Sequence, residues 1–192
     1  TELNRISSHL VALATNGMDI GALSMMIYGF RDREMILNFF EKTSGLRMNN
    51  NYIRPGGVAV DLPPGWRADV REILDMLPEK LGEYDDLLEN NPIWLERTQG
   101  IGVITPEECR AYDITGTTLR STAVASDLRK AFPYSRLEEY DFDIPVGTRG
   151  DVYDRYRIRV EEVKQSMRIV EQAMERMPKG DYRIDDRKIT PP

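Results

Sequence analysis

Hydrophobic residues recur at alternating three- and four-residue steps along much of the chain, and this spacing is typical of amphipathic helices packed into a bundle. The pattern is clearest over 151–177, where we expect a full bundle helix with Asp151 near its positive end. A second helix is expected over about 67–90, with Pro78 in its middle as a point of kinking or splitting. The apolar seam of the 151–177 helix consists of Tyr156, Val160, Val163, Met167, Val170, Met174 and Met177, and the charged residues Glu161, Glu162, Lys164 and Arg168 are expected to cover its other face.

Shorter patterns fill the rest of the chain. A charged turn at 31–34 leads into a predicted helix that stops near Gly45. The Gly- and Pro-rich stretch 46–66 predicts a small hairpin or irregular crossing, and Thr105-Pro106 predicts the start of a short helix. Residues 140–145 alternate in the manner of a strand. We therefore predict a single domain, 1–192, that is mainly α: a helical bundle with long irregular connections and minor β.

The amino-terminal part of the chain contains one conspicuous acid. Asp19 is the only Asp, Glu, Lys, Arg or His between Leu10 and Phe30, although 30% of the chain is charged. Removing an ionised carboxylate from water is costly, so this group must be paired, must cap a helix, or must hold its proton. Asp19 is therefore either a helix cap or a chemically active group.

Two interpretations of Asp19 remain open on the residues alone. In the first, a helix ends at the turn-prone Asn16-Gly17 pair, and Asp19 caps a second helix that follows. In the second, one helix runs from about residue 2 to residue 30, and Gly17 lies on its seam, where a neighbouring helix can approach closely. Thr15 and Asp19 then share a face and point a hydroxyl and a carboxyl into a cavity.

Composition excludes several classes of function. The net charge is −6, which argues against a surface for nucleic acid or for anionic lipid. A membrane span over 10–30 conflicts with the polar residues in its middle and with the lack of basic flanks. With Cys109 and His9 as the only cysteine and histidine, the chain cannot hold a disulfide, a Cys/His zinc site or an all-Cys iron–sulfur cluster by itself. We expect both residues to be structural.

A set of motifs in one order along the chain resembles the D subunit of bacterial NADH-quinone oxidoreductase (respiratory complex I), the homologue of the nickel–iron hydrogenase large subunit. The motifs cover nearly the whole chain. They are NRISSHLVALATNGMDIGALS, FRDRE, NNYIRPGGVAVDLP, TGTTLRST, DLRKAFPYS, DFDIPVGTRGDVYDRY, VEEVKQSMRIVEQ and the closing ITPP.

The resemblance implies a central fragment of a longer subunit, in keeping with a chain that opens on Thr1 rather than Met. It implies a chain that binds no cofactor itself and packs against the subunit bearing the terminal iron–sulfur cluster, beside the quinone that the complex reduces in a reaction coupled to proton translocation. The place of such a subunit is the cytoplasmic face of the cell membrane, peripheral to it. We expect the isolated fragment to be inactive and, with unpaired bundle faces, able to form a homodimer.

The resemblance also implies residue roles. Asp19 matches a buried aspartate that is proposed to help protonate reduced quinone, and Thr15 matches a threonine that lines the same cavity. Asn49, Arg54 and Arg129 fall on segments near the partner interface or the cluster. The rival hypothesis, from a different class, is a non-catalytic helical scaffold that docks partner subunits of the peripheral arm.

Four positions depart from the family pattern. Asn49 stands where many members have a histidine, which puts histidine-linked proton coupling at that place in doubt. Ala123 and Ser126 stand where a glycine and an aromatic residue are usual, so packing there is expected to differ. Met25 replaces a proline, which removes a helix breaker. The hydrogenase metal chemistry requires two Cys-x-x-Cys pairs, which a chain with one cysteine cannot supply.

Overall fold

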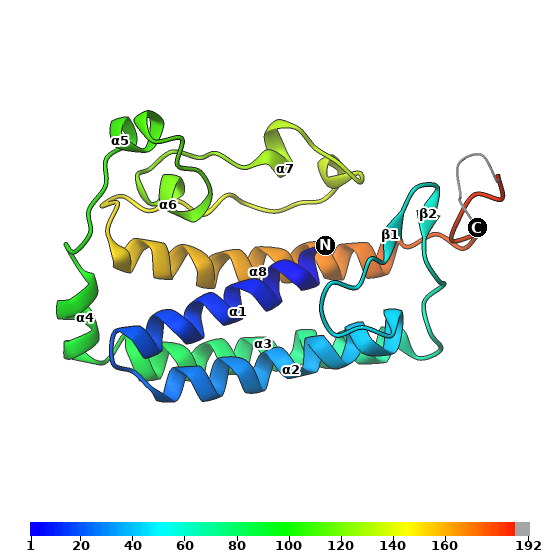
Figure 1. The fold of residues 1–192 in the computed structure, drawn as a ribbon, viewed down its shortest axis with the longest axis horizontal. Coiled ribbons are helices and arrows are strands. Elements are labelled where there is room, and N and C mark those ends of the chain that lie inside the picture. Colours follow the sequence, from blue (N-terminus) through cyan, green and yellow to red (C-terminus); the bar gives the residue numbers. More distant parts are fainter. Residues whose placement is uncertain (187–192) are drawn as a thin grey trace.

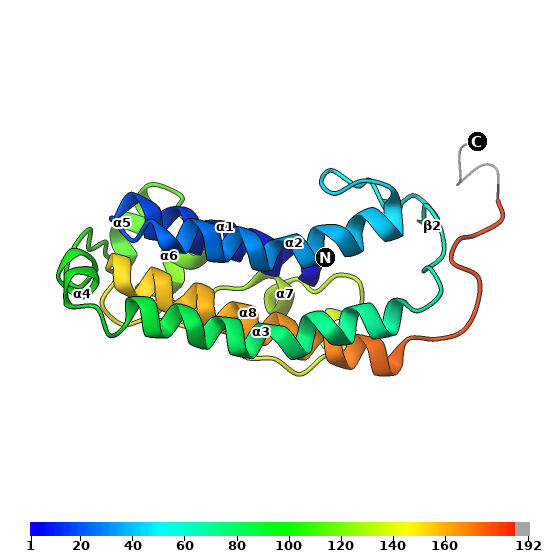
Figure 2. The same cartoon turned by 90° about the horizontal axis from the view of Figure 1, so that it is seen from below.

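Four long helices lie side by side in two layers in the computed structural model, which describes residues 1–186 (Figure 1, Figure 2). One layer contains α1 (Glu2–Asp19) and α2 (Ser24–Ser44), and the other contains α3 (Trp66–Leu88) and α8 (Val152–Arg176). Their apolar seams meet between the layers and form the main core. The prediction of a mainly α bundle with minor β is confirmed.

The first predicted helix is interrupted. α1 ends at Asp19 and α2 begins only at Ser24, so the single helix expected from residue 2 to residue 30 is wrong. The alternative is wrong as well, because Asp19 is the last residue of α1 and does not cap α2, which follows Leu23 without a side-chain cap. The chain reverses at Gly21, whose φ of +108° lies in the left-handed region that favours glycine.

Small residues let α1 and α2 approach each other closely. A Cβ added at Gly29 would lie 2.7 Å from the Cβ of Ala14 and 3.0 Å from the carbonyl oxygen of Leu10. A Cβ added at Gly17 would lie 2.6 Å from the Cβ of Met25. Carbon–carbon contacts of 2.6 and 2.7 Å are shorter than real Cβ atoms make, so the close packing of α1 against α2 requires glycine at these positions. The expectation that Gly17 admits a neighbouring helix is confirmed.

α2 continues through 31–34, where a charged turn was predicted. The helix can continue here because hydrogen bonds and ion pairs satisfy its charged residues. Asp32 is buried and accepts hydrogen bonds from the hydroxyl of Tyr84 on α3 (2.6 Å) and from the guanidinium of Arg31 (2.6 Å). The predicted end is confirmed, since Gly45 follows α2 with φ +77°. None of the helices within residues 1–186 is both long enough and apolar enough to cross a bilayer.

The predicted small hairpin is present after α2. β1 (Ile53–Arg54) pairs antiparallel with β2 (Gly57–Val58), and Ile53 lies opposite Val58. Two short helices follow α3: α4 (Pro92–Thr98) and α5 (Pro106–Ala111). The predicted start of α5 is confirmed by a capping box between Thr105 and Glu108.

An irregular segment, residues 112–150, lies along α8 on the side away from α2 and α3, and we call it the crossover (Figure 1). It contains α6 (Gly116–Ser121), α7 (Leu128–Ala131) and the short 3₁₀ helix η1 (Leu137–Glu139). It leads into α8, whose first turn is capped by buried Asp151: one carboxylate oxygen accepts from the N–H of Asp154 and the other from that of Gly100, each at 2.8 Å.

The strand predicted over 140–145 does not form, although its alternation is correct. Phe142 is buried while its two acidic neighbours are exposed. The backbone N–H groups of Asp141 and Asp143 donate to the side-chain oxygens of Gln172 and Gln165 on α8, each at 2.9 Å. An extended segment that satisfies its donors on a helix needs no partner strand.

We expect Gly29→Ala to destabilise the protein by about 1–3 kcal/mol, because the new methyl group overpacks the contact between α1 and α2. The matched control is Gly82→Ala in α3, where an added Cβ meets nothing within 4 Å. That change should stabilise by about 0.5–1 kcal/mol, because glycine is a poor helix former. Urea unfolding of both variants tests the pair, and equal effects would contradict the close approach.

Candidate functional site

Asp19 ends α1 with an exposed side chain. One turn earlier, the hydroxyl of Thr15 donates to the backbone carbonyl of Val11 (2.9 Å), so it is used within the helix. Asp19 forms no ion pair in the part of the chain that the structure describes. The second interpretation of the sequence expected both side chains to point into one apolar cavity. In this chain they do not.

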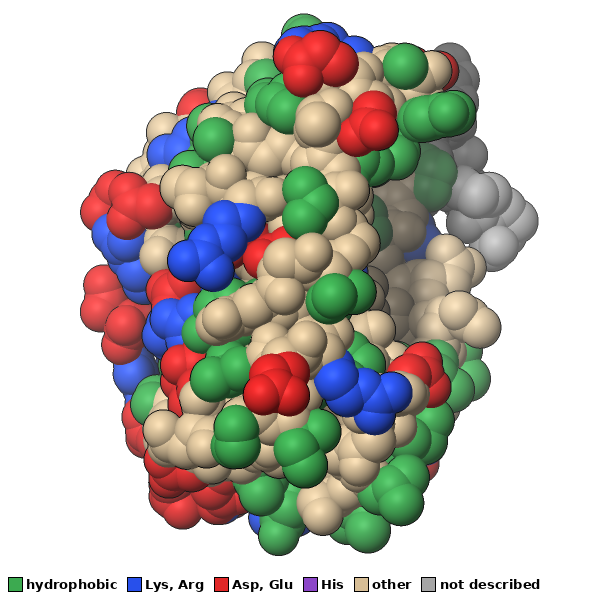
Figure 3. All heavy atoms as spheres, turned by 90° about the vertical axis from the view of Figure 1, so that its left-hand side faces the viewer, with side chains coloured by type: hydrophobic (Ala, Val, Ile, Leu, Met, Phe, Trp, Pro, Cys, Tyr) green, Lys and Arg blue, Asp and Glu red, His purple; other side chains and the backbone are tan. Residues whose placement is uncertain are grey.

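Hydrophobic side chains lie exposed at the end of the bundle that contains the turn after Asp19, interspersed with acidic and basic ones (Figure 3). Leu23 and Ile27, at the start of α2, are 69% and 72% exposed, and Ile93 on α4 is 64% exposed. The turn after Asp19 is held by Arg97 of α4, which donates to the carbonyl of Ile20 (2.7 Å). The carboxylate is therefore presented on a fixed backbone next to apolar surface.

Asn49 and Arg54 follow α2 in the sequence, and both side chains are also exposed. Asn49 has φ +54°, and its segment folds back along α2, where Arg47 pairs with Glu41 (3.3 Å). Arg54 lies on β1, at the end of the bundle opposite the turn that follows Asp19 (Figure 1). The fold thus does not bring Asp19 and Arg54 together in one site.

An apolar cavity of about 640 Å³ opens at this opposite end, near the hairpin formed by β1 and β2. Its walls come from the start of α1, the end of α2, the start of α3 and the end of α8. The large side chains that line it include Phe39, Phe40, Trp66, Tyr140 and Met174. Neither Thr15 nor Asp19 contributes to it.

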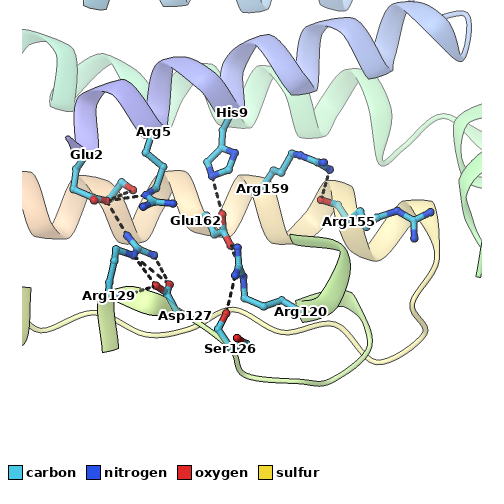
Figure 4. Close-up of polar contacts among 11 residues, drawn as sticks. Glu2, Arg5, His9, Arg120, Ser126, Asp127, Arg129, Arg155, Arg159 and Glu162 are labelled. Atoms are coloured by element: carbon cyan, nitrogen blue, oxygen red, sulfur yellow. Dashed lines mark hydrogen bonds and ion pairs between the residues drawn. The ribbon is translucent and has the colours of Figure 1, made fainter. Parts of the chain in front are cut away.

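Arg129 is buried among carboxylates of its own chain (Figure 4). It is 2% exposed and contacts Asp127 at 2.7 Å and Glu2, from α1, at 2.8 Å. Ser166 of α8 donates to the same oxygen of Glu2 (2.7 Å), and the guanidinium lies 4.7 Å from the ring centre of Phe142. The guanidinium is engaged inside the chain, so the geometry offers no support for the prediction that it faces a partner subunit.

The electrostatics of this cluster favour its ionised form. Burial works against the charge on Asp127, but the hydrogen bonds from Arg129 outweigh it and hold the pKa of Asp127 below its ordinary value. Burial likewise works to lower the pKa of Arg129, and the contacts with Asp127 and Glu2 raise it instead. The crossover is thereby tied to α1 and α8 by paired charges with little access to water.

A second buried cluster joins His9 of α1, Glu162 of α8 and Arg120 of α6 (Figure 4). Glu162 is 1% exposed, so its assignment to the exposed face of the helix is wrong. One of its oxygens lies 2.7 Å from Nε2 of His9, and the other accepts from Nε of Arg120 (2.7 Å). Burial works to raise the pKa of Glu162, but His9 and Arg120 overcome it and hold that pKa below its ordinary value.

Sequence reasoning missed this cluster, although a signal was present. Polar residues on α8 also recur at helical steps, beside the apolar seam, and a polar stripe with helical spacing indicates a face that meets another element. α1 carries a matching stripe. The two stripes and their partners in the crossover, which we call the ionic layer, are Glu2, Arg5, His9, Arg159, Glu162, Ser166, Arg120, Asp127 and Arg129.

A known protein family matches most of the chain. Residues 19–192 match the family described as "Respiratory-chain NADH dehydrogenase, 49 Kd subunit". The chain belongs to this family. Its curated relatives include the D subunit of NADH-quinone oxidoreductase from Nocardia farcinica, 53% identical over 191 residues, and the D 2 subunit of the same enzyme from Chloroflexus aurantiacus, 51% identical over 195 residues. All of the chain aligns in both cases, but it spans only 42% and 47% of those proteins.

The structure shows the surroundings of three of the positions that depart from the family pattern. Ala123 has φ +67°, a left-handed conformation that glycine adopts without cost. At Ser126 the backbone carbonyl, which any residue supplies, accepts from Arg120 (2.8 Å). Met25 is the second residue of α2, and its N–H donates to the carbonyl of Ala22 (3.0 Å), a bond that a proline at this position could not make. The closing ITPP motif, 189–192, lies outside the described residues.

We expect Arg129→Gln to lower the free energy of unfolding by about 3–5 kcal/mol, because it leaves the carboxylates of Glu2 and Asp127 buried without their counter-charge. The control is Arg136→Gln, whose side chain is 74% exposed and pairs with Glu139 at 2.7 Å. An exposed pair of this kind should give no measurable change. Chemical unfolding at neutral pH measures both, and a silent Arg129→Gln would contradict the buried ion pairs.

We expect Ala123→Gly to stabilise the chain by about 1 kcal/mol, because it relieves the left-handed backbone. Ala125→Gly, at a nearby exposed position with ordinary backbone, should destabilise by up to about 1 kcal/mol, because glycine adds freedom to the unfolded chain. Thermal unfolding of both variants gives the comparison. Two changes of the same sign would rule out strain at Ala123.

Proposed function

We propose that this chain is the central helical part of a subunit that forms one wall of the quinone cavity in an NADH:quinone oxidoreductase. What carries the proposal is the family membership, with about half of the residues identical across the whole chain to proteins named for NADH and quinone. In the proposed assembly, electrons reach quinone from the terminal iron–sulfur cluster of a partner subunit. The chain holds no redox cofactor of its own, and quinone reduction is coupled to proton translocation.

Asp19 is the proposed proton donor to the reduced quinone. It stands at the turn between α1 and α2, it forms no ion pair among the described residues, and exposed aliphatic side chains share this end of the bundle. A segment or subunit that covers this end removes water from the carboxyl, and desolvation favours the protonated form that can donate. Thr15 then lines the same wall one turn earlier on α1.

The proposed contact with the cluster-bearing subunit uses the segment around Asn49 and Arg54. Both side chains are exposed, and the guanidinium of Arg54 is bound only to the carbonyl oxygen of Asn51 (3.3 Å) among the described residues. Arg129 contributes indirectly by holding the crossover against α1 and α8. We place the assembled subunit at the cytoplasmic face of the membrane, peripheral to it.

A second candidate function is a docking bundle without chemistry of its own. The exposure of Asp19 favours it, because the side chain lies at the surface and not in an apolar pocket. The aliphatic side chains around it would then serve only to bury area against a partner. In isolation, the same surface is a site through which two copies of the fragment pair, and the fragment alone is proposed to be inactive toward NADH.

The two functions are separated by Asp19→Asn in the complete complex. If Asp19 donates a proton, quinone reductase activity should fall about tenfold or more while assembly is retained, since general acids contribute factors of this order or larger. The measurement is NADH:quinone turnover per assembled complex, with electron arrival at the terminal cluster monitored alongside.

The control for this change is Asp86→Asn, an exposed aspartate on α3. It should leave both turnover and assembly unchanged. Full turnover in Asp19→Asn would favour the docking bundle. Loss of assembly in Arg54→Gln, together with a silent Asp19→Asn, would establish it.

A further inference from the structure

The ionic layer contains one side chain that ordinarily changes charge near neutral pH. His9 is the only histidine of the chain, and its ring is 13% exposed between α1 and α8. Its Nε2 lies 2.7 Å from an oxygen of Glu162, which is itself 1% exposed. An imidazole with an ordinary pKa of about 6.5 responds strongly to a carboxylate at this distance, because little water screens the contact.

Glu162 is fixed by a second cation. Arg120 lies 2.5 Å from the other carboxylate oxygen and also donates to the carbonyl of Ser126 (2.8 Å). The carboxylate thus has one oxygen bound by a permanent charge and one that faces a group whose charge can change. Arg120 stays charged whether or not the imidazole is protonated, so it stabilises the ionised carboxylate in both states.

The other cations beside His9 in the ionic layer are Arg5 of α1 and Arg159 of α8 (Figure 4). Arg159 of α8 is partly buried and donates one hydrogen bond, to the carbonyl of Arg155 (3.0 Å). Arg5 of α1 faces Glu2 at 3.3 Å, and Arg129 of α7 faces Glu2 and Asp127. Those two carboxylates are therefore paired with arginines, and Glu162 is the carboxylate that contacts His9.

We propose that His9 and Glu162 form a buried proton-binding site, in which the imidazole takes up and releases a proton against the Glu162 carboxylate. The site is independent of the role proposed for Asp19. His9 and Asp19 lie ten positions apart on α1, about 15 Å along the helix axis, which is too far for direct proton transfer.

The site links protonation to the packing of α1 on α8. With the proton bound, an imidazolium and a carboxylate join the two helices in a charge-assisted contact. With the proton released, Glu162 remains paired with Arg120 alone, and the cross-helix contact loses its charge. α1 is the helix that presents Asp19, so its seating on α8 becomes sensitive to proton uptake ten residues from its end.

The test is a pH titration of the 192-residue chain with ¹⁵N-labelled imidazole, which reports a single ring because the chain has one histidine. In Glu162→Gln the midpoint of the imidazole titration should fall by about one pH unit or more, because the attracting charge is gone. In Arg120→Gln it should rise, because the carboxylate then serves His9 alone. The matched control, Glu161→Gln, alters an acid that pairs with Lys164 at 2.6 Å, and should leave the midpoint unchanged.

The opposite signs make the test decisive. If the two variants merely loosened the structure, both would move the ring toward the behaviour of a free imidazole, in the same direction. Shifts of the same sign, no shift in either variant, or a ring that does not titrate would overturn the proposal. Should Glu162→Gln fail to fold, Arg120→Gln and the control still decide between a rise and its absence.

Discussion

A charged side chain that leaves water must meet its counter-charge inside the protein, and this requirement shapes the interface between α1, α8 and the crossover. Arg129 reaches from α7 to Glu2 on α1, and Arg120 reaches from α6 to Glu162 on α8. If the crossover left the bundle, these charges would be stranded in the interior. An irregular segment with little secondary structure of its own is therefore held in one position by paired charges, which tie it to two helices at once.

The same helix, α1, also makes a close apolar contact with α2. Gly17 and Gly29 allow α1 and α2 to approach until backbone and side chains touch. One face of α1 is thus committed to small-residue packing and another to the ionic layer, which leaves its orientation little freedom. Its last residue, Asp19, is consequently presented at a defined place on an exposed and partly aliphatic end of the bundle. The β1–β2 hairpin and the apolar cavity lie at the other end, so the two surfaces proposed for partners are separated by the length of the helices.

Where an element depends on local patterns, the sequence predicted it well. The apolar seam of α8 as far as Met174, Asp151 at its start and the helix start at Thr105 are local features, and all three were found where expected. Met177, the last residue of the predicted seam, follows the end of α8 and is exposed. The single helix expected through Asp19 failed, because Gly21 adopts a left-handed conformation that the hydrophobic spacing does not reveal. The strand expected over 140–145 failed because its N–H groups bond to glutamine side chains on α8, contacts between residues far apart in the chain.

The sequence by itself determined the class of the fold, the family through its co-linear motifs, and Asp19 as a residue that requires an explanation. Only the tertiary structure decided that Asp19 is exposed in this chain, that Arg129 is buried, and that His9 meets Glu162. The physical reason is that helix spacing is a property of neighbours along the chain, whereas burial and ion pairing are set by which helices meet. A polar stripe on α8 is compatible with solvent or with a partner, and the choice is made by the crossover packed against it.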